Sequence, residues 1–158
     1  MLERPANIVI KGARLIFKNF SGKDEKFLHD GTRHFGLVIE DPEHVEKLIK
    51  EGWNVKEFVP KGQEPGEEVS ICYIDVKISF DIVPPVVKLV GRHGPVPITE
   101  DEIHMLDDVE IINADVAVRP YVWSVNGNEG IKAYLKTLYV TIGEDEFAAD
   151  YEDVGVFD

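Results

Sequence analysis

Aromatic and basic residues alternate along two short segments near the end of the chain, on either side of a turn-forming sequence. The first segment, 119–125, reads RPYVWSV, and the second, 131–136, reads IKAYLK. Strict alternation predicts β-strands with one face in the core and the other outside. Exposed rings interleaved with Lys and Arg can stack on nucleobases, at about 1–3 kcal/mol per base, and hold phosphates. The residues expected on this outer face are Arg119, Tyr121, Trp123, Lys132, Tyr134 and Lys136.

The pairing of the two segments decides which of these side chains meet. Residues directly opposite each other in an antiparallel pair share a face. We expect Tyr121 opposite Lys136 and Trp123 opposite Tyr134, with a four-residue loop from Gly127 to Gly130. The competing interpretation is that the rings pack under a loop or against another sheet, as large aromatics on strands commonly do.

Earlier strands carry further candidates for the same chemistry. The segment 7–20 predicts a long strand with a bend, and 32–40 and 69–80 predict two more strands. Rings on these strands would add stacking positions, and cations would add phosphate contacts. The candidates are Phe17, Phe20, Phe35 and Tyr73 among the rings, and Arg14, Lys18 and Lys77 among the cations.

Caps and breaks between the strands indicate few helices. Asp41 can cap a helix that has Pro42 at its first position and Gly52 at its end. Thr99 and Glu102 form a capping box for one or two further turns. Many strands with one or two short helices before a terminal hairpin predict a mostly β fold, a small barrel like the OB-fold.

The charge is unevenly distributed along the chain. The 158 residues carry a net charge of −13, which by itself disfavours nucleic-acid binding. Seven acids lie in 144–158 and six in 100–110, and neither segment contains Lys or Arg. The remaining 17 acids balance the 17 basic residues, so the rest of the chain is neutral. We expect one domain over residues 1–143, with moderate and salt-sensitive binding, and an acidic tail over 144–158.

Catalytic motifs are not recognised in the sequence. It has no Walker loop, no Gly-rich dinucleotide motif, no CxxC pair and no HExxH. We therefore expect a binding protein with no catalytic residues, no cofactor and no metal. Two weaker alternatives are a metal site that uses His93 and His104, and a Mg²⁺-dependent nuclease that uses the acids of 100–110. Helix capping and solvation explain these residues more simply.

The sequence also predicts where the protein acts. Its single cysteine, Cys72, is expected to be a buried thiol on the strand at 69–80. The N-terminus lacks the apolar core of a signal peptide, and no apolar run approaches the roughly 20 residues that span a bilayer. We expect a cytoplasmic protein with no membrane partner.

Three stretches of the sequence carry a family resemblance. They are NIVIKGARLIFKNFSGK at 7–23, HFGLVIED at 34–41 and WSVNGNEGIKAYLKTLYVTIGEDEFAADYEDV at 123–154. Together they resemble the single-stranded DNA-binding proteins of tailed phages and prophages, over essentially the whole chain. Family tails commonly finish on an aromatic residue, whereas here Asp158 follows Phe157.

The resemblance implies a fold, a function and partners. The fold is an OB-fold domain that coats single-stranded DNA during replication, recombination or repair. The acidic tail from Glu144 engages replication or recombination proteins and competes with DNA for the cleft. The positions that match the family's binding pattern are Tyr121, Trp123, Lys132, Tyr134 and Lys136.

A different class of protein fits the same pattern. In a β-rich structural phage protein, the aromatic face would be a subunit interface, and a homodimer is a further hypothesis for the assembly. Salt separates these interpretations, because phosphate binding weakens steeply as salt rises whereas an apolar interface hardly responds.

Overall fold

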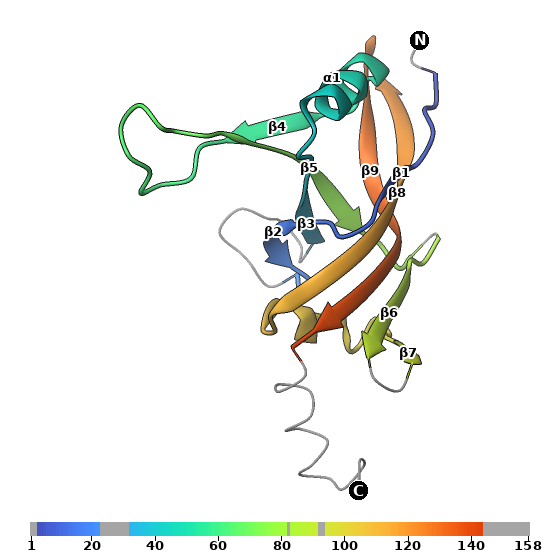
Figure 1. Ribbon diagram of the computed structural model, residues 1–158. Coiled ribbons are helices and arrows are strands. Elements are labelled where there is room, and N and C mark those ends of the chain that lie inside the picture. The colour runs from blue at the N-terminus through green and yellow to red at the C-terminus, as the bar shows by residue number, and fades with distance from the viewer. Residues whose placement is uncertain (1–2, 23–31, 82, 92–93, 144–158) are drawn as a thin grey trace, which may run out of the picture.

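A computed structural model describes residues 3–22, 32–81, 83–91 and 94–143 of the chain. Within these ranges, no helix is long and apolar enough to cross a membrane. His93, the acidic tail and most of the loop around 21–31 lie outside the described residues. The elements in chain order (Figure 1) are β1 (Ile8–Ile10), β2 (Leu15–Asn19), β3 (Arg33–Val38), α1 (Pro42–Glu51), β4 (Val55–Phe58), β5 (Ile71–Ile78), β6 (Val86–Gly91), β7 (Gly94–Pro97), the 3-10 helix η1 (Ile103–Asp107), β8 (Ile111–Val125) and β9 (Asn128–Ile142).

The strands form one mixed sheet. Its hydrogen-bonded path is β1-β8-β9-β5-β3-β2, with β4 added to β5, and with β6 pairing β9 and β7. β8 and β9 are antiparallel, whereas β9 pairs in parallel with β5 and β6. β1 and β2 are the two ends of the path, and no ladder joins them within the described residues. A mostly β fold with one α-helix is confirmed, but the sheet is open, and the expected closed barrel is not shown.

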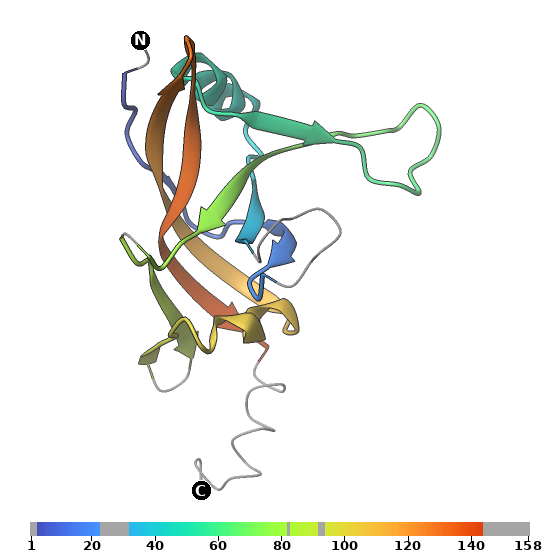
Figure 2. The same cartoon turned by 180° about the vertical axis from the view of Figure 1, so that it is seen from behind.

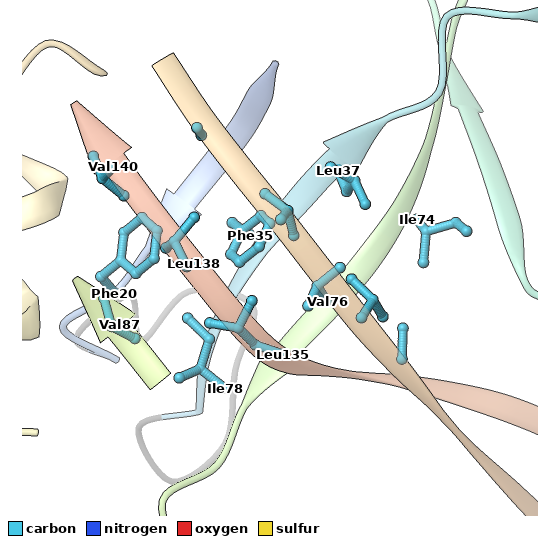
Figure 3. Close-up of a cluster of buried hydrophobic side chains, with 14 of the residues drawn as sticks. Phe20, Phe35, Leu37, Ile74, Val76, Ile78, Val87, Leu135, Leu138 and Val140 are labelled. Atoms are coloured by element: carbon cyan, nitrogen blue, oxygen red, sulfur yellow. The ribbon is translucent and has the colours of Figure 1, made fainter. Parts of the chain in front are cut away.

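The core lies on the inner face of this sheet (Figure 3). Alternation along β3, β5 and β9 sends Phe35, Val76 and Leu135 inward, and all three are buried. Phe20 and Phe35 are fully buried, with their ring centroids 5.6 Å apart. The prediction that these two rings could contact nucleic acid is therefore wrong, because both point into the core. Cys72, which was expected to be buried, is half-buried.

The helix α1 has the boundaries that its caps predict. The carboxylate of Asp41 accepts a hydrogen bond of 3.0 Å from the backbone N–H of Glu43, and Gly52 ends the helix with a φ of +101°. Trp53, directly after the helix, forms a bridge with Ile131 of β9. The chain leaving α1 is therefore fixed beside the β8–β9 hairpin, while the loop between β4 and β5 extends away from the body (Figure 2).

The β8–β9 hairpin has a tighter register than expected. Tyr121 is opposite Lys132 and Trp123 is opposite Gly130, so the turn has two residues, Asn126 and Gly127. Their φ values of +52° and +82° are the left-handed conformations of a type I′ hairpin turn. The predicted register is therefore wrong by four residues. Because a shift by an even number keeps each residue on its face, the outward-facing set is largely retained.

Candidate nucleic-acid interface

The outer surface of the hairpin carries a row of side chains in contact. Tyr134 lies between Arg119, whose Cζ is 5.2 Å from the ring centroid, and Tyr121, whose ring centroid is 6.1 Å away in an edge-to-face arrangement. Tyr121 is 52% exposed, and Tyr134 is half-buried. Cation–π and edge-to-face contacts restrain these rings before any ligand binds. We call the hairpin face the set Arg119, Tyr121, Trp123, Lys132 and Tyr134.

Trp123 lies against a glycine of the opposite strand. A Cβ atom built on Gly130 would lie 2.8 Å, 2.9 Å and 3.0 Å from the Cζ2, Cε2 and Nε1 atoms of the indole. The indole therefore occupies space that any other residue at position 130 would need. Trp123 can take this position because its cross-strand partner, Gly130, has no side chain.

β5 extends the outer surface beyond the hairpin. Lys77 is the partner of Tyr134 in the parallel β5–β9 pair, and His34 of β3 is opposite Lys77 on its other side. Paired residues share a face, so one surface runs from Arg119 through Tyr134 and Lys77 to His34. His34 Nδ1 is 2.8 Å from Asp75 Oδ1, two residues before Lys77 on the same face.

A groove of about 580 Å³ opens where the sheet forks. The edge of β5 pairs with β4 at Ile71–Ile74 and with β9 at Val76–Lys77, and the groove lies between these pairings and the hairpin. We call it the fork groove. Its lining residues are Gly52, Trp53, Asn54, Lys56, Ile74, Asp75, Lys77, Trp123, Glu129, Gly130, Ile131, Lys132 and Ala133.

Two properties of the fork groove suit a ligand. The ammonium groups of Lys56, Lys77 and Lys132 form no ion pair or hydrogen bond with any described residue. Trp53 is only 4% exposed, and its indole N–H has no hydrogen-bond partner among the described residues. Unneutralised cations attract phosphate, and a buried donor without a partner is uncommon outside functional or strained sites.

A second aromatic group lies on the same face of β5. The ring centroids of Phe17 and Phe58 are 4.9 Å apart, and that of Tyr73 lies 5.4 Å from Phe17 and 5.9 Å from Phe58. We call these three residues the Phe17 cluster. Phe17 is 51% exposed and has a φ of +51° at a bulge in β2. This conformation is costly for a bulky residue, and such outliers tend to occur at functional sites.

Sequence reasoning missed two residues of this surface, Lys56 and Phe58 of β4. Lys56 is opposite Tyr73 in the β4–β5 pair and lines the fork groove. The signal was the alternation in VKEF, which repeats the basic–aromatic spacing of the hairpin on a strand of only four residues.

Two of the predicted cations lie away from the groove. The ammonium group of Lys18 donates to the carbonyl oxygens of Leu106 and Val109, at 2.9 Å and 3.0 Å, and so ties β2 to the region of η1. Lys136 is the exposed extra residue of a bulge in β9, between Leu135 and Thr137, and does not line the groove.

An acid of the segment 100–110 has a local structural role. The carboxylate of Asp107 accepts hydrogen bonds from the backbone N–H groups of Phe20, at 2.6 Å, and Ser21, at 2.9 Å. Among the residues that the structure describes, no three His, Cys, Asp or Glu side chains lie close enough to hold a metal ion.

Comparisons with known proteins assign the chain to a family. A family model described as "Putative phage ssDNA-binding domain" matches residues 2–158. The structure is similar to the single-stranded DNA-binding protein from bacteriophage Enc34 with a C-terminal truncation, at 13% identity and a TM-score of 0.50, covering 87% of this chain and 86% of that one. A second structure of the Enc34 protein gives 14% identity and a TM-score of 0.48, covering 85% and 79%. Comparison with curated proteins gave no match. The structural likeness concerns the fold alone, but the family model spans nearly the whole sequence, and the chain belongs to the family of phage single-stranded DNA-binding domains.

Proposed function

We propose that the chain binds single-stranded DNA by stacking bases on two groups of rings and holding phosphates between them. The two groups are the hairpin face and the Phe17 cluster, which lie on the same face of the sheet. The observation that carries this proposal is the fork groove between them, where three lysines that have no partner among the described residues lie near Trp123. These lysines are Lys56, Lys77 and Lys132.

The spacing of the two groups suggests how much DNA the surface takes. Tyr73 of the Phe17 cluster and Lys77, the partner of Tyr134, are four residues apart on β5. This separation is about 13 Å at about 3.3 Å per residue. Single-stranded DNA with stacked bases rises about 3.4 Å per nucleotide, so about four nucleotides cover this distance. An extended DNA strand covers it with fewer. A single nucleotide therefore cannot engage both groups at once.

Stacking also sets the selectivity and the biological role that we propose. Every base has a π-face, so sequence preference is weak, and a duplex hides these faces. The protein would coat and protect single strands during phage replication, recombination or repair, without catalysing a reaction. The acidic tail, residues 144–158, would recruit replication or recombination proteins.

We also infer an OB-type arrangement of the sheet. β1 and β2 are separated by only four residues, although they lie at opposite ends of the strand path. In this connection, the N–H of Ala13 donates to the carbonyl of Ala114 at 2.7 Å, and the N–H of Val38 donates to the carbonyl of Arg14 at 3.0 Å. One bent segment thus touches both β8 and the end of β3, as the first strand of a small barrel does.

The test is a binding titration of labelled oligo-dT and of a duplex of the same length at two salt concentrations. Single-strand affinity should fall with salt, with a slope of about −0.7 per phosphate contact and so about −2 for three lysines. Lys77→Gln and Lys132→Gln should each reduce the slope by about 0.7, whereas Lys47→Gln, on the exposed surface of α1, should not. Equal affinity for single strand and duplex would contradict the proposal. Salt-independent self-association with no DNA binding would favour a subunit interface.

A further inference from the structure

We propose that the fork groove is a pocket for one nucleobase and that Asp75 makes it favour cytosine over uracil and thymine. This inference rests on the proposed function and adds a base preference to it. The observation behind it is the carboxylate of Asp75, which lines the groove together with Glu129 and three lysines.

The groove has the size and the walls of a site for one small ligand. Its volume of about 580 Å³ lies within the range of roughly 300–1,000 Å³ typical of small-molecule pockets. Trp123 forms one wall, whereas the lining residues Ile74 and Ala133 are almost fully buried in the core. An aromatic wall favours a base over a phosphate, so the base points inward and the sugar–phosphate backbone stays near the lysines.

Asp75 is held in one orientation and keeps a free acceptor. Its Oδ1 is 2.8 Å from Nδ1 of His34, and both side chains are partly buried, at 31% and 19% exposure. An ionised carboxylate can only accept hydrogen bonds, so Nδ1 carries the proton in this contact. Oδ2 makes no hydrogen bond with the described residues. The pocket therefore presents an oriented acceptor to which no residue in the described part of the chain donates.

The pyrimidines differ in what they offer this acceptor. Cytosine carries an amino group at C4, which donates to Asp and Glu carboxylates in protein–DNA complexes. Uracil and thymine carry a carbonyl oxygen at the same position, which a carboxylate repels. Cytosine and uracil have the same ring size and both lack the 5-methyl group, so they differ only at C4 and at the neighbouring N3, which is an acceptor in cytosine and an N–H donor in uracil. The proposed preference therefore requires that Asp75 contacts the C4 substituent and not N3.

The preference should be modest, because only one base of the bound strand occupies the pocket. The other bases stack on the hairpin face and the Phe17 cluster, which accept any base. We expect oligo-dC to bind about fivefold more tightly than oligo-dU of the same length, near the lower end of the discrimination that base-edge hydrogen bonds give.

The experiment measures the affinities of the full chain for labelled oligo-dC and oligo-dU at neutral pH and one salt concentration. Asp75→Asn supplies an amide that can donate to the C4 carbonyl, so the dC/dU ratio should fall to one or below while the affinity for oligo-dU rises. Glu57→Gln is the matched control. It removes the same charge from an exposed residue of β4 that does not line the groove, and it should leave the ratio unchanged.

Each outcome separates this inference from the proposed function. A parent protein that binds both oligonucleotides equally well overturns the base preference and leaves DNA binding intact. A ratio that survives in folded Asp75→Asn overturns the role of Asp75. Folded parent protein that binds neither oligonucleotide overturns both proposals. The parent ratio is decisive by itself, so the inference is tested even if the variant does not fold.

Discussion

Two rings of the proposed DNA-binding surface lie directly against glycines. Trp123 covers Gly130, and a Cβ atom on Gly36 would come within 3.0 Å of Cδ2 of Tyr73 and 2.8 Å of Cγ1 of Ile16. In both cases a residue with no side chain lets an aromatic ring approach the backbone of the neighbouring strand. These glycines have no side chain to contact a base, but they fix the positions of two rings that we propose to stack on bases.

Gly130→Ala should weaken binding to oligo-dT although it removes no candidate contact. The new methyl group must displace the indole of Trp123, so the loss should approach the value of one stacked base, about 1–3 kcal/mol. Gly91→Ala is the control, because a Cβ atom there meets nothing within 4 Å. Binding titrations and denaturant unfolding of both variants check this. A folded Gly130→Ala protein with parental affinity would show that the position of the indole does not matter.

Two substitutions of Phe17 separate the contribution of its ring to binding from the cost of its backbone conformation to stability. Phe17→Ala and Phe17→Gly both remove the ring and should lose similar affinity for oligo-dT, about 1–3 kcal/mol if it stacks on a base. Only glycine adopts a φ of +51° without strain, so Phe17→Gly should exceed Phe17→Ala in unfolding free energy by about 1 kcal/mol. Equal stability of the two variants would show that residue 17 is not strained in solution.

At the scale of elements, Lys18 lies on β2 beside the proposed stacking residue Phe17, yet its own role is structural. Lys18→Met removes two hydrogen bonds from an ammonium group to the carbonyls of Leu106 and Val109. The free energy of unfolding should fall by about 2 kcal/mol, while the salt dependence of DNA binding stays unchanged. Lys132→Met should do the reverse. A reduced salt slope for Lys18→Met would restore this residue as a phosphate contact.

The sequence predicts where the strands lie, and which face each side chain takes, better than it predicts how the strands pair. Alternation correctly gives the outward direction of Tyr121 and Trp123, because direction depends only on odd or even position. Alternation does not distinguish registers that differ by an even number of residues. The Asn126-Gly127 dipeptide, which is typical of two-residue type I′ turns, was the signal that would have fixed the register. The helix α1 was predictable because both of its caps are local.

The fork groove could not be predicted in the same way. It exists because β5 changes partner from β4 to β9, which brings Lys77 beside Tyr134 from 57 positions away in the sequence. No local pattern records that change of partner. Lys56 and Phe58 were missed because a strand of four residues allows too little alternation to recognise.

At the scale of the whole molecule, the acidic tail should act as a built-in competitor. Deleting residues 144–158 removes seven acids and no Lys, Arg or His, so the net charge changes from −13 to −6. The affinity for single-stranded DNA should rise, because we expect the acids of the tail to repel DNA and its acids and rings together to imitate a short strand. The rings of the tail are Phe147, Tyr151 and Phe157.

A peptide with the tail sequence separates mimicry from general repulsion. Added to the truncated protein, it should displace oligo-dT, whereas a version with its three rings replaced by Ala should displace much less. Equal competition by both peptides would reduce the effect of the tail to its charge.

The position of the two tryptophans has an optical consequence. The chain contains only Trp53 and Trp123, and both line the fork groove, one almost fully buried and the other half-buried. All indole emission of the unlabelled protein therefore originates at the walls of one groove. Binding of a strand there should quench it, and Trp123→Phe should leave only the contribution of the buried Trp53. Oligonucleotide binding that leaves the emission unchanged would place the DNA elsewhere on the molecule.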